Sequence, residues 1–316
     1  MPERALARYY QILGGERRAL YLLAKAASAP GRKLTSHGSL LDLKIELAEK
    51  MLSSCGMCER KCSADRAAGV RGHCGVLEPR ISTEFIHMGE EPDLVPSHTV
   101  FFAGCTFGCV FCQNWDISTD PSSGTEMDAR ELARRIERRA DRRKGFNLEA
   151  SRNVNWVGGE PTPNVHFILN VLRECEANIP QVWNSNMYMS EDTMDLLEDV
   201  VDVYLADYKY GNDDCARRLS DVEDYSRIVR RNLLIGRAHA EMIIRHLVLP
   251  GHVDCCTRPV LTWIAQNLND VKVNVMGQYR PEYKARDHPG LDRPIPASEY
   301  RKALEIAEDL HLDLCD

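Results

Sequence analysis

The sequence predicts an α/β protein built on an open (βα)6 partial TIM-type barrel, with an N-terminal helical extension and a cysteine-rich metal-binding module in front of it. Two observations predict this class. From residue 99 onward, short apolar runs alternate with amphipathic segments, which is typical of parallel strands joined by crossover helices. The 316 residues, 44% of them hydrophobic, suffice for one large core with appendages. We expect three parts: the extension at 1–54, the module at 55–97 and the barrel at 98–316.

Each element follows from local periodicity. The extension carries leucines at helical spacing, around Leu20 and again around Leu40, with a break at Pro30-Gly31. The module is loop-rich, with one strand expected around Ile81 to Met88. The strands expected in the barrel are Thr99 to Ala103, Val154 to Val157, Val182 to Asn184, Val201 to Ala206, Met242 to Leu249 and Val271 to Met276. The helices expected between them lie near 126 to 144, 164 to 177, 190 to 198, 222 to 236 and 257 to 268.

Three cysteines follow the first barrel strand at the spacing C-x3-C-x2-C: Cys105, Cys109 and Cys112. Three thiolates cannot saturate a four-iron cluster, so one iron would stay open to a small molecule. An open iron is a reaction site. The alternatives are a zinc loop with a distant fourth ligand, or buried thiols without a metal.

A second motif lies one strand-helix unit downstream, where Val157 is followed by Gly158, Gly159, Glu160 and Pro161. With both motifs in this order, the chain resembles the radical S-adenosylmethionine enzymes. The resemblance implies that the triad holds a [4Fe-4S] cluster and that the open iron chelates the amino and carboxylate groups of S-adenosylmethionine. It also implies that the Gly-Gly-Glu-Pro segment meets that amino group. Phe111 offers a flat apolar face for an adenine ring.

Twelve cysteines in a chain without an evident export signal indicate metal chemistry rather than disulfides. Four of them form a second group, Cys55, Cys58, Cys62 and Cys74, which can wrap one metal centre. Structural zinc and a second [4Fe-4S] cluster both fit this spacing, and we expect the cluster. His73 in the same stretch is expected to be a neighbouring surface histidine, with replacement of a cysteine ligand as the alternative. The cysteines expected to be ordinary packing thiols are Cys175, Cys215, Cys255, Cys256 and Cys315.

Two further segments narrow the resemblance. Asp207-Tyr208-Lys209-Tyr210 and the stretch from Ile244 to Gly251 are similar to the corresponding segments of pyruvate formate-lyase activating enzymes and their PflX-like relatives, over residues 55 to 300. The resemblance implies that the methionine and ribose parts of S-adenosylmethionine lie among Asp207, Lys209, Arg245, Asn184 and Ser185. The simpler interpretation of Asp207 and Lys209 is an exposed ion pair of little energetic consequence.

The chain departs from activating enzymes in two places. The cysteine quartet precedes the triad, and Gln278 and Tyr279 stand where an activase has a histidine. We therefore expect an oxidoreductase that cleaves S-adenosylmethionine to a 5'-deoxyadenosyl radical and removes hydrogen from an unactivated C–H bond of a peptide, a protein or a small molecule. The alternatives are sulfur insertion or substrate oxidation with a second cluster, activation of a glycyl-radical enzyme, and a non-catalytic iron-sulfur electron-transfer protein.

Composition bounds the partners. The net charge is −7, which provides no global basic field for nucleic acid, and the basic run from Arg130 to Lys144 is interpreted as a solvated helix face. No apolar run approaches the roughly 20 residues that span a membrane, and no secretory signal is evident, so a cytoplasmic location is expected. The resemblance implies an electron donor such as flavodoxin or ferredoxin.

Overall fold

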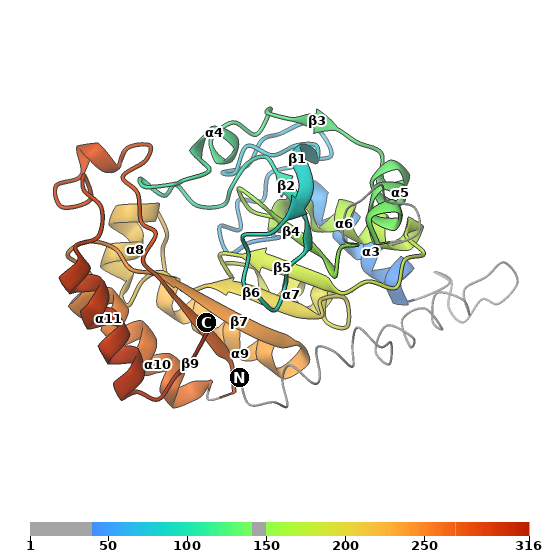
Figure 1. Cartoon of the computed structure of the whole chain (residues 1–316). Helices are drawn as coiled ribbons and strands as arrows, with labels where there is room; N and C mark the ends of the chain where they lie inside the picture. Colours follow the sequence, from blue (N-terminus) through green and yellow to red (C-terminus); the bar gives the residue numbers. More distant parts are fainter. Residues whose placement is uncertain (1–39, 141–149, 269, 316) are drawn as a thin grey trace, which may run out of the picture.

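The computed structural model describes residues 40–140, 150–268 and 270–315. The part of the predicted helical extension at 1–39 therefore lies outside the described residues. Within them, nine strands form one sheet in the order β3-β1-β2-β4-β5-β6-β7-β8-β9 (Figure 1). Their bounds are β1 Arg80–His87, β2 Ser97–Phe102, β3 Thr125–Glu126, β4 Asn153–Gly158, β5 Gln181–Ser185, β6 Val203–Asp207, β7 Glu241–Leu247, β8 Lys272–Met276 and β9 Asp313–Leu314.

Strands β2 and β4 to β9 pair in parallel, whereas β1 runs antiparallel to β2 and β3 runs antiparallel to β1. The six predicted barrel strands correspond to β2 and β4 to β8, and the strand expected in the module is β1. The predicted fold class is confirmed. Parallel pairing brings the carboxyl ends of these six strands to one edge, which is where α/β proteins bind ligands.

The helices cover the outer face of this sheet, with α9 against β6 and β7 and α11 against β8. Their bounds are α3 Leu40–Lys50, α4 Trp115–Ser118, α5 Ala129–Ala140, α6 Val165–Glu174, α7 Glu191–Leu197, α8 Asp213–Ser220, α9 Tyr225–His239, α10 Arg258–Asn267 and α11 Ala297–Asp309. The sequence did not predict α8 or α11. Helix α8 is short and rich in charged residues, and it begins at a side-chain cap in which Asn212 Oδ1 accepts from the Cys215 amide at 2.8 Å.

A small apolar core fills the barrel itself. Its residues are Leu94, Val182, Val203, Leu205 and Ile243. Leu94 comes from the loop between β1 and β2, and the others come from β5, β6 and β7. This loop, residues 88–96, precedes the amino end of β2 and thus closes the barrel opposite the carboxyl ends of the strands. We call it the plug loop.

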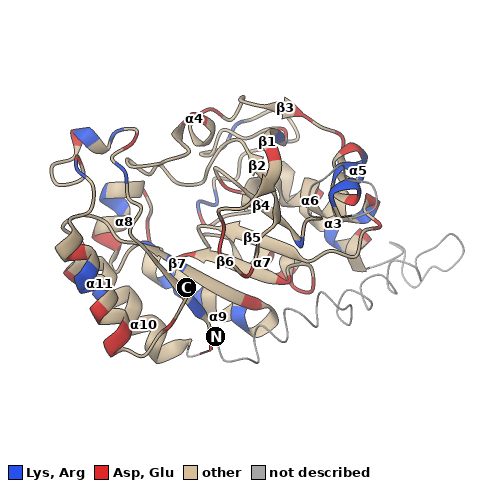
Figure 2. Cartoon of the chain, viewed as in Figure 1, with Lys and Arg blue, Asp and Glu red and all other residues tan. Residues whose placement is uncertain are grey.

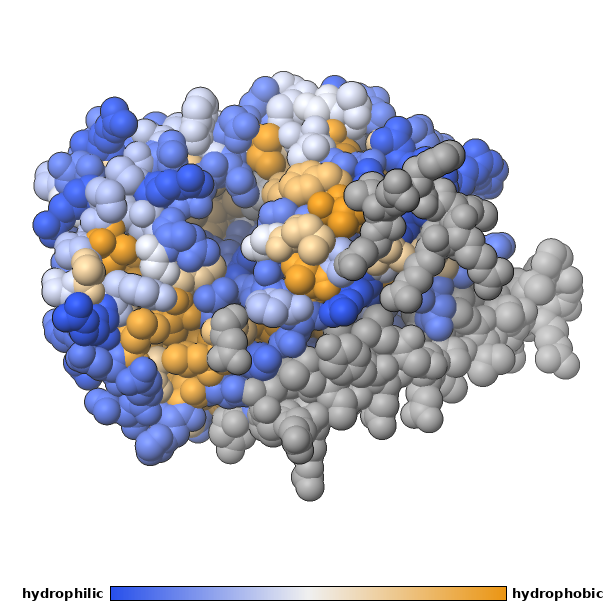
Figure 3. Space-filling view, viewed as in Figure 1, coloured by the Kyte–Doolittle hydropathy of each residue, from blue (hydrophilic) through white to orange (hydrophobic). Residues whose placement is uncertain are grey.

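The surface mixes charges of both signs (Figure 2). The arginines of α5 stand out there, and several are paired: Arg135 with Glu131 and Glu84, and Arg139 with Glu84. Hydrophilic residues predominate on the face shown in Figure 3, which is hollowed toward its centre. None of the helices in the described ranges is long and apolar enough to cross a bilayer.

Candidate functional site

One cavity of about 280 Å³ lies at the carboxyl ends of the parallel strands. It is lined by the segment after β2, by the ends of β5, β6 and β7, and by the turn that follows β4. The structure brings to it the three triad cysteines and all nine predicted cofactor-binding residues: Phe111, Gly158, Gly159, Glu160, Asn184, Ser185, Asp207, Lys209 and Arg245. These residues span 141 positions of sequence, from 105 to 245, and meet only because the strands are parallel.

Each triad thiol lies beside a hydrogen-bond donor. Ser220 Oγ donates to Cys109 Sγ at 2.9 Å, Ser118 Oγ lies 3.3 Å from Cys112 Sγ, and the Phe107 amide donates to Cys105 Sγ at 3.4 Å. Burial raises the pKa of Cys105 well above its usual range and that of Cys109 to about 11. A bound metal centre would supply the positive charge that buried thiolates need, so this donor set fits an iron-sulfur cluster.

Two glycines at the carboxyl end of β4, Gly158 and Gly159, let this backbone approach the loop that carries the triad. Gly158 has φ +126, and a Cβ there would lie 2.1 Å from the carbonyl oxygen of Phe102. A Cβ on Gly159 would lie 2.1 Å from the carbonyl oxygen of Gly104. A side chain at either position would therefore push the two backbones apart. The glycines bring the Glu160 segment against the loop that carries the triad.

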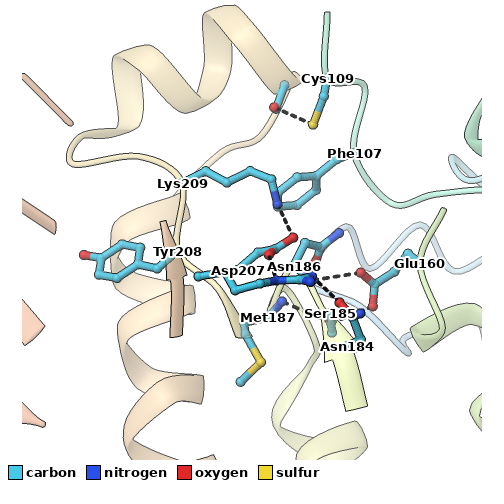
Figure 4. A network of polar contacts seen from close by, with 12 residues as sticks. Phe107, Cys109, Glu160, Asn184, Ser185, Asn186, Met187, Asp207, Tyr208 and Lys209 are labelled. Carbon is cyan, nitrogen blue, oxygen red and sulfur yellow. Dashed lines mark hydrogen bonds and ion pairs between the residues drawn. The ribbon is translucent and has the colours of Figure 1, made fainter. Parts of the chain in front are cut away.

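The Glu160 carboxylate is buried and already oriented. Its Oε1 accepts from Thr162 Oγ1 at 2.5 Å and from Ser185 Oγ at 2.7 Å. Its Oε2 accepts from the Asn186 amide at 3.0 Å, and Figure 4 shows Glu160 beside Ser185 and Asn186. Burial raises the pKa of Glu160, and these donors oppose the rise. Since a carboxylate oxygen accepts two hydrogen bonds, Oε2 keeps capacity for a ligand donor.

A charged network forms the opposite wall. Lys209 Nζ lies 2.5 Å from Asp207 Oδ2, and Arg245 Nε donates to Asp207 Oδ1 at 3.1 Å (Figure 4 shows Asp207 and Lys209). Arg245 also donates to Asn184 Oδ1. Burial alone would raise the pKa of Asp207, but Lys209 and Arg245 outweigh it and lower that pKa. The Asp207 and Lys209 side chains are 21% and 17% exposed, so the alternative of an exposed pair is wrong.

The sequence analysis missed Glu90. This carboxylate belongs to the plug loop, and it lies 3.4 Å from Arg245 and accepts from Asn155 at 3.0 Å. Arg245 is thus held between Asp207 on the cavity side and Glu90 beneath it. Glu90 follows no barrel strand, and a Gly-Glu-Glu-Pro stretch in a loop is the single signal that the sequence offered.

The quartet thiols are also neighbours. Burial raises the pKa of Cys58 to about 12, and Cys74, Cys55 and Cys62 add to the shift. An isolated antiparallel β-bridge pairs the backbones of Cys58 and Met189. Arg60 Nε donates to the carbonyl of Thr106, beside the triad, at 3.0 Å. The module is therefore docked on the loop after β5 and on the triad loop.

The structure brings three of the remaining cysteines together. Cys215, Cys255 and Cys256 are expected from the sequence to be ordinary packing thiols, and their sulfurs all lie within 4.8 Å of one another. They are separated by 40 positions of sequence, and the close packing of the loops after β6 and β7 brings them together.

Comparison with known proteins agrees with this geometry. Residues 99–264 match the family model described as the Radical SAM superfamily. The chain belongs to this superfamily. It is 49% identical over 282 residues to the uncharacterised protein MJ0674 of Methanocaldococcus jannaschii, which covers 87% of this chain and 80% of that protein. It is 26% identical over 157 residues to the pyruvate formate-lyase 1-activating enzyme of Escherichia coli K12, covering 49% of this chain and 61% of that enzyme.

Among solved structures, the chain is similar to Streptococcus suis SuiB bound to the precursor peptide SuiA, with a TM-score of 0.46 and 16% identity. The match covers 66% of this chain and 46% of SuiB, so the chain spans about half the length of that protein. Membership of the radical SAM superfamily implies a [4Fe-4S] cluster and S-adenosylmethionine as cofactors. The predicted family resemblance is therefore confirmed.

Proposed function

We propose that this chain cleaves S-adenosylmethionine reductively at a [4Fe-4S] cluster held by Cys105, Cys109 and Cys112, and removes hydrogen from an unactivated C–H bond of a peptide, a protein or a small molecule. The observation that carries the proposal is a cavity in which the triad meets a buried carboxylate and a buried cation network. Superfamily membership supports the reaction class.

The bound cluster supplies the electron for cleavage, and the chain supplies binding and orientation. Glu160 Oε2 is placed to accept from the ammonium group of S-adenosylmethionine, because its other donors already fix the carboxylate. Lys209 and Arg245 provide positive charge toward the ligand carboxylate. Phe111 is buried beside Tyr279, with ring centroids 6.0 Å apart, and presents an apolar face for the adenine.

A non-catalytic electron-transfer protein is the competing class. Such a protein needs cluster ligands but has no use for a ligand-sized cavity beside them. Burying Glu160, Asp207 and Arg245 is costly unless each charge is compensated, and this chain compensates all three around the cavity. The arrangement favours an enzyme.

The test is formation of 5'-deoxyadenosine by the anaerobic full-length chain with S-adenosylmethionine and a strong reductant. Cys105→Ala, Cys109→Ala and Cys112→Ala should each abolish the product and lower bound iron by about four atoms, one [4Fe-4S] cluster. Cys315→Ala is the matched control, because Cys315 does not line the cavity, and it should retain both. Wild-type product formation by any triad variant would refute the mechanism.

We further propose that the 55–97 module holds a second [4Fe-4S] cluster at its quartet. A zinc ion with four Zn–S bonds of about 2.3 Å requires sulfurs about 3.8 Å apart. In the part of the chain that the structure describes, the three thiols whose sulfurs all lie within 4.8 Å of one another are Cys215, Cys255 and Cys256, and no three of the quartet form such a group. Thiolates that bind different irons of one cluster lie farther apart, which suits the quartet.

Metal analysis of Cys58→Ser distinguishes a [4Fe-4S] cluster from a zinc ion at the quartet. Loss of about four irons, with the triad cluster kept, is expected for the second cluster, and loss of about one zinc would refute it. A second cluster would favour substrate oxidation or sulfur insertion. Activation of a glycyl-radical enzyme is the other candidate, because of the similarity to the pyruvate formate-lyase activating enzyme. In each of these reactions, an electron donor such as flavodoxin or ferredoxin would reduce the triad cluster.

A further inference from the structure

Three cysteines outside the triad and the quartet converge at the rim of the barrel. Cys215 lies in the first turn of α8, and Cys255 and Cys256 lie in the π-helical turn Val253–Thr257 that precedes α10. The Sγ atoms of Cys215 and Cys255 are 4.0 Å apart, and those of Cys255 and Cys256 are 3.9 Å apart. All three lie within 4.8 Å, a spacing that lets them share one ion. We call them the thiol trio.

The backbone around the thiol trio holds its two segments together. Asn212 caps α8 through Oδ1, and its Nδ2 donates to the carbonyl of Cys255 at 2.8 Å, so one side chain fixes both segments. Gly211 allows close approach, since a Cβ there would lie 2.6 Å from the carbonyl oxygen of Cys255 and 2.9 Å from the Cα of Cys256. The two backbone segments that carry the three thiols are therefore held close together.

The chemistry of the trio favours a single thiophilic dication. A tetrahedral ion with M–S bonds of about 2.3 Å places its thiolates about 3.8 Å apart, close to the sulfur–sulfur distances of 4.0 and 3.9 Å in the trio. A four-iron cluster binds each thiolate to a different iron and would need wider spacing. A disulfide would use two of the thiols and leave the third. Burial raises the pKa of Cys256 and of Cys255, so these two thiols are neutral when no metal is bound.

We propose that Cys215, Cys255 and Cys256 bind one Zn²⁺ through three thiolates, with the fourth position on the solvent side beside the exposed Cys255. Binding displaces three thiol protons and involves no electron transfer. The three thiolates and the dication carry a net charge of −1, which the open position exposes to water.

The ion would fasten the loop after β6 to the loop after β7. The first of these loops carries Lys209 and Tyr210, and Tyr210 OH lies 2.5 Å from Ser220 Oγ, which donates to Cys109 Sγ at 2.9 Å. The same loop thus connects the thiol trio to the triad through a short run of contacts. Fixing this loop would hold the Ser220 hydroxyl against the triad sulfur.

The experiment measures zinc and iron in the full-length chain, purified anaerobically with both iron-sulfur sites reconstituted. Wild type and the control Cys315→Ser should carry one zinc that Cys255→Ser and Cys215→Ser lose, with iron unchanged in all four. Cys255 is exposed, so Cys255→Ser is expected to fold even where the buried Cys215→Ser does not. Competition with a chelator should show Zn²⁺ affinity lowered by more than about 100-fold, because even a change beside a metal ligand costs about 10- to 100-fold.

Cobalt provides an independent signal. Co²⁺ added to the reconstituted, reduced chain should give a thiolate-to-cobalt charge-transfer band that Cys255→Ser weakens and Cys315→Ser keeps. Zinc content that is the same in Cys255→Ser as in wild type would overturn the proposal, since the zinc would then belong to other ligands. Loss of iron in place of zinc, or a Cys215–Cys255 disulfide in a reduced-purified chain that takes up neither ion, would overturn it as well.

Discussion

Replacing Glu160 with Gln tests the cavity with a change of one atom. An amide can keep the carbonyl oxygen that accepts from Thr162 and Ser185, but its NH2 group then faces the Asn186 amide, which donated at 3.0 Å. The position of Oε2 changes from a charged acceptor to a donor. A hydrogen bond to a charged group contributes about 1.5–3 kcal/mol. Because 1.4 kcal/mol is about tenfold in affinity, S-adenosylmethionine should bind about 10- to 150-fold more weakly.

The assay is equilibrium binding of S-adenosylmethionine to the reconstituted chain under anaerobic conditions, with iron content and thermal unfolding measured on the same samples. Glu84→Gln is the matched control. Glu84 is also a largely buried carboxylate, paired with His98 and Arg139, but it does not line the cavity. Its variant should bind the ligand within about twofold of wild type. An unchanged affinity in Glu160→Gln, with iron at the wild-type level, would refute the assigned role of Oε2.

Three other perturbations follow from the same contacts. Arg245→Ala should weaken ligand binding and lower the free energy of unfolding by about 1.5–3 kcal/mol, because Asp207 and Glu90 each lose one cation partner and keep Lys209 and His87; chemical denaturation measures this, and a loss below about 1 kcal/mol would contradict it. Ser220→Ala should keep the triad cluster but make its reduction potential more negative, since the Ser220 hydroxyl stabilises added negative charge at Cys109; a redox titration followed by electron paramagnetic resonance should show the shift, and an identical potential would count against it. Burial would raise the pKa of Glu84, but His98 and Arg139 hold it at about 2, below the usual 4.5. The ionised Glu84 therefore stabilises the fold above pH 4.5, and this contribution to stability is lost as the pH falls toward 2. Glu84→Gln should make the free energy of unfolding less dependent on pH between about 2 and 4.5, which denaturation at several pH values measures.

The sequence predicted the barrel well because its signals are local. Each of the six strands is a short apolar run, and the observed bounds differ from the expected ones by about two residues. The Cys105 and Glu160 motifs lie directly after two of these strands. Once strands are parallel, residues that follow them meet at one edge, so the position of the cavity could be predicted from order alone.

The sequence could not predict contacts that depend on packing between distant loops. Cys215 lies 40 positions before Cys255, and nothing in either segment indicates that Gly211 lets them approach. Glu90 was missed for the same reason, since its partner Arg245 is 155 positions away. Helix α8 has too few apolar residues to show helical periodicity in the sequence. The Asn212 cap at its start is the feature of the sequence that indicates a helix there.

The plug loop makes the cavity dependent on the opposite end of the barrel. Arg245 is supported from below by Glu90, and residue 91 of the same loop accepts from Asn274 at 3.0 Å while Asp93 pairs with Lys272 at 2.7 Å. A shortened chain beginning at residue 98 would keep the triad and every residue assigned to S-adenosylmethionine, and it would lose all three of these supports. Homologues that differ in this loop could therefore differ in cofactor affinity while their cavity residues are identical. We therefore expect the smallest active fragment of this chain to include the plug loop.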